Sequence, residues 1–186
     1  HLFRSSQVLG EALDTVLAND PLALRQLLRR RRQTHVWHRV VAREALRRGH
    51  EDRATHLREG ALRHGCDPAL LRDDQRELVP MMLRRFFEDG SWHRLDAAWS
   101  RYGAVLSGAF DPLQEVGHML TAAGRGALAE PFFRAALDVR RDIAHVHGGL
   151  SVALSAQGRL REAVDAALAG RGWVPVSYTH LRAHET

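Results

Sequence analysis

Twelve histidines are the side chains of this sequence that first suggest a metal site, since imidazole is a common metal ligand. His35 and His38 are three residues apart and would share one face of a helix, whereas His145 and His147 would not. A zinc site needs three or four protein ligands. Neither pair comes with a third ligand at a suitable spacing, so we predict no metal site.

Catalytic chemistry has one weak candidate, the thiol of Cys66 with the nearby imidazole of His64. A lone thiol in a loop is ordinarily unreactive. The sequence also has no nucleophile elbow, no glycine-rich phosphate loop after a strand and no HExxH motif. We therefore predict that this stretch of chain is not an enzyme and binds no cofactor. With a single cysteine, it can form no internal disulfide.

The densest charge is a run of four arginines, Arg29 to Arg32. All 27 basic residues are arginine, yet 22 acidic residues are interspersed, and the formal net charge is only +5. Such a run could contact nucleic acid. A helix beginning near Pro21 would instead place these cations in its last turn, where the helix dipole favours them. No aromatic residues interleave the run, so we favour the helix-end interpretation and keep nucleic acid as the weaker alternative.

Helices must position these residues. Gly and Pro are sparse, while Leu, Ala, Arg and Glu dominate, which indicates segments of roughly 11 to 16 helical residues separated by short breaks. No apolar run approaches the roughly 20 residues needed to span a bilayer. Apolar stripes at helical spacing are expected in three places: Val36, Val40, Val41 and Ala45; Leu78, Met82, Leu83 and Phe86; Ile143, Val146, Leu150 and Leu154.

Three glycines at regular intervals indicate a repeat. Gly90, Gly124 and Gly158 each follow a helical segment and are spaced 34 residues apart. The segment from Asp111 to Leu137 resembles the tetratricopeptide repeat (TPR) family in its small and large positions, which are Gly117, Leu120, Gly124, Ala129, Phe133, Ala136 and Leu137. The resemblance implies an all-α, TPR-like solenoid of antiparallel helical hairpins, with Phe133 buried between hairpins.

The resemblance divides the chain into repeats at 35–68, 76–109, 110–143 and 144–174, the last one truncated, after a loosely similar hairpin at 1–34. An irregular N-terminal helical domain is the alternative for the first third. Gly49 precedes Gly90 by 41 residues, which predicts an insertion in Cys66 to Asp74. There Asp67 and Pro68 predict a helix start, and Asp74 with Glu77 predicts a second one.

The last twelve residues, PVSYTHLRAHET at 175–186, resemble a translated sequencing-library adapter. We expect them to be a non-native tail that packs on nothing. The sequence opens at His1, so a targeting segment cannot be judged, and with a single cysteine we expect a cytoplasmic protein.

By resemblance, the first helix of each hairpin lines a concave groove that binds a protein or peptide and not a membrane. The groove arginines could favour an acidic segment. The residues that would project there are Arg39, Arg43, Arg47, Arg84, Glu88, Gln114, His118, Thr121 and His145. The expected function is a protein-interaction scaffold. The alternative is the recognition arm of a larger enzyme, such as a bacterial sulfotransferase, glycosyltransferase or oxygenase, and rests on analogy alone.

Overall fold

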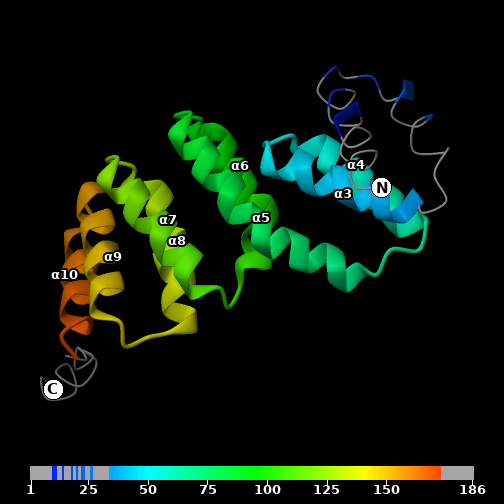
Figure 1. The fold of residues 1–186 in the computed structure, drawn as a ribbon. Helices are drawn as coiled ribbons and strands as arrows, with labels where there is room; N and C mark the ends of the chain where they lie inside the picture. Colours follow the sequence, from blue (N-terminus) through cyan, green and yellow to red (C-terminus); the bar gives the residue numbers. More distant parts are fainter. Residues whose placement is uncertain are drawn as a thin grey trace, which may run out of the picture. The chain divides into compact units, whose positions relative to one another are not determined.

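The computed structural model of the chain describes residues 34–172 and positions 10, 11, 14, 18, 20, 22, 23 and 26. In this part of the chain every regular element is a helix, so the predicted all-α, TPR-like class of antiparallel helical hairpins is confirmed (Figure 1). The chain divides into two compact units, His1–Val105 and Leu106–Thr186. The run Arg29 to Arg32 and the segment 175–186 lie outside the described residues, and the 1–34 hairpin lies mostly outside them.

The described part of the first unit holds two helical hairpins. Helix α3 (Thr34–Arg47) packs on α4 (Glu51–Arg63), and α5 (Pro68–Glu88) packs on α6 (Trp92–Tyr102). The two first helices, α3 and α5, also contact each other. The core of the unit is apolar, and its fully buried members include Val41, Ala61, Val79, Met82, Leu83, Phe86 and Leu95.

The second unit also holds two hairpins. The unit begins at Leu106, which is the last residue of a short 3-10 helix, η1 (Gly103–Leu106). Four helices follow: α7 (Phe110–Ala122), α8 (Gly126–Val139), α9 (Ala144–Ala156) and α10 (Leu160–Ala169). Each helix contacts the next, and the two first helices, α7 and α9, contact each other as well. The second hairpin therefore stacks on the first, as the repeat spacing predicts.

The periodic glycines end the first helix of each hairpin. Gly90, Gly124 and Gly158 have φ angles of 65°, 73° and 74°, in the left-handed region that glycine enters without steric cost. At Gly90, the N–H of Ser91 donates to the carbonyl of Phe86 (2.8 Å), and the N–H of Gly90 donates to that of Phe87 (3.0 Å). This pair of bonds is the Schellman arrangement. It recurs at Gly124 and Gly158, so the predicted helix ends are confirmed.

Phe133 of α8 fills the space between the two hairpins of the second unit, and its side chain is fully buried. Two glycines of the first helices make room for it. A Cβ atom built on Gly117 of α7 would lie 2.8 Å from the Phe133 ring, and one on Gly149 of α9 would lie 2.5 Å from it. The predicted burial of Phe133 is thus confirmed, and its reason is close helix approach at two glycines.

The two adjacent glycines of α9 should respond to alanine with opposite signs. Gly148→Ala adds a methyl group into open space and should raise the free energy of unfolding by about 0.5 to 1 kcal/mol through helix propensity. Gly149→Ala has the same propensity gain but drives a methyl group into the Phe133 ring. Because such overpacking costs about 1 to 3 kcal/mol, the net effect should be destabilising. Urea unfolding of both variants tests this, and equal shifts would contradict the packing at Phe133.

Helix α5 explains the extra residues between the first two hairpins. As predicted, Asp67 caps it, accepting a hydrogen bond from the N–H of Ala69 (2.9 Å), and Pro68 is its first residue. The predicted second start at Asp74 and Glu77 is wrong, because α5 runs unbroken from Pro68 to Glu88 and the Asp74 carboxylate bonds to arginines of α3. At 21 residues, α5 is the longest helix of the described part of the chain, in which no helix could cross a bilayer.

Candidate functional site

In the second unit, four of the side chains predicted to line a groove lie on α7 and α9. Gln114, His118 and Thr121 belong to α7 and His145 belongs to α9. The Oε1 atom of Gln114 lies 3.3 Å from Nε2 of His145. The His118 and His145 rings stack, with their centroids 5.6 Å apart and an angle of 26° between their planes. Successive first helices thus bring Gln114, His118 and His145 together.

Within this cluster, His118 is held against the hydrophobic core. Its ring meets the Phe133 ring edge to face at 4.9 Å between centroids. Burial lowers the pKa of His118, and the nearby His145 lowers it further. Nε2 of His118 is buried and has no hydrogen-bond partner among the described residues. Both effects disfavour the protonated form of the His118 ring.

Thr121 lies one turn after His118 on α7. Its hydroxyl donates to the carbonyl of Gly117 in the same helix (2.9 Å). The side chain is half-buried, as are those of Gln114 and His118, while His145 is exposed. These four side chains carry hydrogen-bonding groups and no carboxylate or guanidinium, so contacts with them would depend on hydrogen bonds more than on charge.

In the first unit, Arg39 and Arg43 point from α3 towards α5. Nε and Nη2 of Arg39 donate to the two carboxylate oxygens of Asp74, each at 2.7 Å, in a bidentate pair. Arg43 bonds to Asp74 as well, and its Nη2 donates to Oε2 of Glu77 at 2.9 Å. Two of the four predicted groove arginines, Arg39 and Arg43, are therefore already bound to carboxylates of the neighbouring helix α5.

Asp74 is buried, with 7% of its side chain exposed. Burial acts to raise the pKa of Asp74, but the hydrogen bonds from Arg39 and Arg43 outweigh it, so the pKa lies below its usual value. Asp74 thus fixes the two arginines, whereas its position before Glu77 predicts a helix start. The signal that could have revealed it was the i, i+4 spacing of Arg39 and Arg43 opposite an acidic residue in the next first helix.

The other two predicted groove arginines lie elsewhere in the first unit. Arg47 pairs with Glu44 of its own helix, and its side chain is 45% exposed. Arg84 lies further along α5 and is exposed. Neither takes part in the Asp74 cluster. Glu88, the last residue of α5, is exposed as well. The nine predicted residues therefore form a cluster of three with Thr121 one turn away, a pair held by Asp74, and three residues outside both groups.

A hollow beside the Asp74 cluster is lined by both apolar and charged side chains. It is formed by α3 and the start of α5, with Val36 and Leu70 among its exposed apolar members. The complete lining is His35, Val36, Arg39, Val40, Arg43, Gly65, Cys66, Asp67 and Leu70. Burial raises the pKa of the Cys66 thiol, which disfavours the nucleophilic thiolate. A hollow of this composition suits an apolar side chain flanked by a polar group.

Both histidine pairs considered for metal binding lie among the described residues. In the part of the chain that the structure describes, no group of three or more His, Cys, Asp or Glu side chains could hold a metal ion. His38 is close to the carbonyl of Thr34, and its ring lies tilted against the His64 ring, with 5.2 Å between centroids. His147 contacts the carbonyl of Arg141. These contacts account for three of the histidines as structural side chains.

Comparisons with known proteins give a likeness of fold only. No protein-family model and no curated protein matches the chain. Among solved structures, MamA AMB-1 is 15% identical with a TM-score of 0.44 over 100% of both chains. A second MamA AMB-1 structure is 16% identical (TM-score 0.43, 91% of this chain and 98% of that one), and MamA MSR-1 is 14% identical (0.42, 91% and 95%). At these values the likeness carries no argument about partners or activity.

Proposed function

We propose that this chain is a protein-interaction scaffold that binds a peptide or protein segment on the faces made by its first helices. The observation that carries the proposal is the meeting of Gln114, His118 and His145 across α7 and α9. Hydrogen-bonding side chains that two successive helices bring together suit the backbone and polar side chains of an extended segment.

In the first unit, the proposed contact is the hollow between α3 and α5. Two apolar residues of its lining, Val36 and Leu70, are 39% and 41% exposed and would contact an apolar side chain of the partner. Arg39 and Arg43 stand beside it, and an acidic partner would have to compete with Asp74 for them. Arg47 and Arg84 complete the proposed binding residues of this unit.

A peptide library displayed against the full chain tests the proposal. We expect selected peptides to lose about tenfold in affinity when His145 is changed to Glu, equivalent to about 1.4 kcal/mol. The change adds charge where the cluster has none. Ala127→Glu is the matched control, because it adds the same charge at an exposed position of the second helix α8 and should leave binding unchanged.

The same peptides report on the partner's charge. If Arg39 and Arg43 engage an acidic segment, affinity should fall as salt rises past about 0.1 M, where the screening length is near 10 Å. A flat salt dependence would show that the arginines stay with Asp74 and that the partner is not selected for acidity. Peptides that bind His145→Glu and Ala127→Glu equally would contradict binding on the α7 and α9 face.

A further inference from the structure

Helix α10 carries an exposed apolar stripe. Leu160 and Val164 are 65% and 56% exposed, and Ala167 is exposed as well. Their i, i+4, i+7 spacing places all three on one face of the helix. Exposed apolar side chains that adjoin one another on one helix face are suited to contact with another helix.

The positions 34 residues earlier show how such a surface is covered inside the second unit. They are Gly126, Glu130 and Phe133 of α8, and all three face the next hairpin. Gly126 lies so close to α9 that an added Cβ would be 2.7 Å from the carbonyl oxygen of Ala153. Phe133 fills the space below Gly149.

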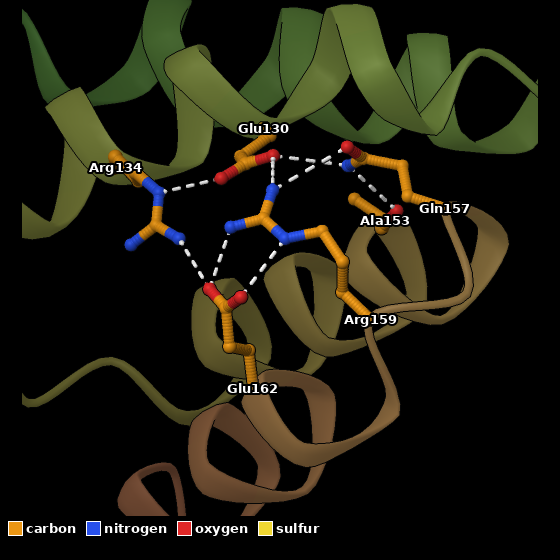
Figure 2. A network of polar contacts seen from close by, with 6 residues as sticks. All are labelled: Glu130, Arg134, Ala153, Gln157, Arg159 and Glu162. Carbon is orange, nitrogen blue, oxygen red and sulfur yellow. Dashed lines mark hydrogen bonds and ion pairs between the residues drawn. The ribbon is translucent and has the colours of Figure 1, made fainter.

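Glu130 completes this interface with hydrogen bonds and ion pairs of its carboxylate (Figure 2). Its Oε2 accepts hydrogen bonds from Nη1 of Arg159 at 2.6 Å and from Nε2 of Gln157 at 3.0 Å, both in the turn between α9 and α10. Arg134 of α8 donates to the other carboxylate oxygen at 2.8 Å. The contact between the two hairpins therefore needs a small residue, an acid and a large ring, in that order.

Helix α10 reverses this pattern. Leucine stands at the position of Gly126, valine at that of Glu130 and alanine at that of Phe133. A further helix packed as α9 packs on α8 would clash with Leu160, since even a Cβ does not fit at Gly126. It would also find valine in the place of the Glu130 carboxylate. Another hairpin in the same register would therefore not pack on this face as α9 packs on α8.

We propose that this face pairs with the same face of a second copy of the chain. In an antiparallel pair related by a two-fold axis near Val164, Leu160 of each copy lies over Ala167 of the other, a large side chain against a small one. Arg161 and Asp165 lie together on one flank of the stripe and are both exposed. In this arrangement the same flanks meet, so Arg161 of each copy faces Asp165 of the other.

The chemistry of the stripe favours a weak dimer. A single helix of ten residues buries less than the roughly 1,600 Å² of a standard stable interface, so association should depend on concentration and lie in the micromolar range. Such pairing lies beyond the proposed segment binding, because it uses a different helix from the α7 and α9 cluster.

Sedimentation equilibrium of the full chain tests the proposal between about 1 µM and 1 mM. The mass should rise with concentration from 20.9 kDa towards twice that value. Val164→Glu should weaken association at least tenfold, since it places two like charges near the axis. Val139→Glu makes the same change at an exposed valine of α8 and should leave association unchanged.

A charge reversal distinguishes this specific dimer from nonspecific association. Arg161→Asp should weaken the dimer by facing Asp165 of the second copy, and adding Asp165→Arg should restore it. A chain that stays at 20.9 kDa throughout overturns the proposal. So does a dimer that survives both Val164→Glu and Leu160→Glu, because its interface must then lie elsewhere.

Discussion

Replacing Phe133 by alanine should lower the free energy of unfolding of the second unit by about 3 to 5 kcal/mol. The ring is fully buried, and it packs on Gly117 of α7 and Gly149 of α9, which have no side chains that could fill the space left behind. The cavity would lie between two hairpins and weaken the contact of α8 with α9. Denaturant unfolding of the full chain, followed by circular dichroism, measures the change.

Two further variants check the origin of this loss. Val139→Ala removes methyl groups from an exposed position of the same helix and should change the free energy of unfolding by no more than about 0.5 kcal/mol. Phe133→Leu keeps most of the apolar volume and should cost less than alanine. A cost for Phe133→Ala as small as that for Val139→Ala would contradict the packing of the two hairpins through this ring.

Much of the fold was predictable because its strongest signals are local. A helix that ends in a left-handed turn needs glycine, so a 34-residue glycine spacing predicts hairpins before any packing is known. The stripe Leu78, Met82, Leu83 and Phe86 is buried as its spacing predicts. Val36 is 39% exposed, although it belongs to a predicted stripe, because it lines the hollow beside α5.

The candidate site was less predictable because it depends on contacts between distant residues. Asp74 lies 35 residues from Arg39 and 31 from Arg43, and nothing in the local sequence distinguishes an acid that caps a helix from one that binds a neighbouring helix. Gly148 and Gly149 are likewise equivalent in sequence, yet only Gly149 meets the Phe133 ring. Tertiary packing decides both cases, and a single sequence carries little information about it.

Changing Asp74 to alanine should lower the free energy of unfolding of the first unit by about 2 to 3 kcal/mol. The change leaves two guanidinium groups between α3 and α5 without their shared carboxylate. Breaking a fully buried pair costs more, but the Arg39 and Arg43 side chains are 30% and 31% exposed, so water offsets part of the loss. Glu77→Gln is the control: its carboxylate is 60% exposed and should contribute no more than about 1 kcal/mol.

The unfolding free energy of Asp74→Asn at acid pH tests whether the charge of Asp74 is what stabilises the contact of α3 with α5. The pKa of Asp74 in the folded chain lies below the ordinary value of 3.8, so its stabilising effect is complete above that pH and is lost as the pH falls through the folded pKa. The difference in unfolding free energy between the unmodified chain and Asp74→Asn should therefore be constant near neutral pH and shrink below about pH 4. If it stays constant into that acid range, or is no larger than for Glu77→Gln, Asp74 does not hold α3 to α5 by charge.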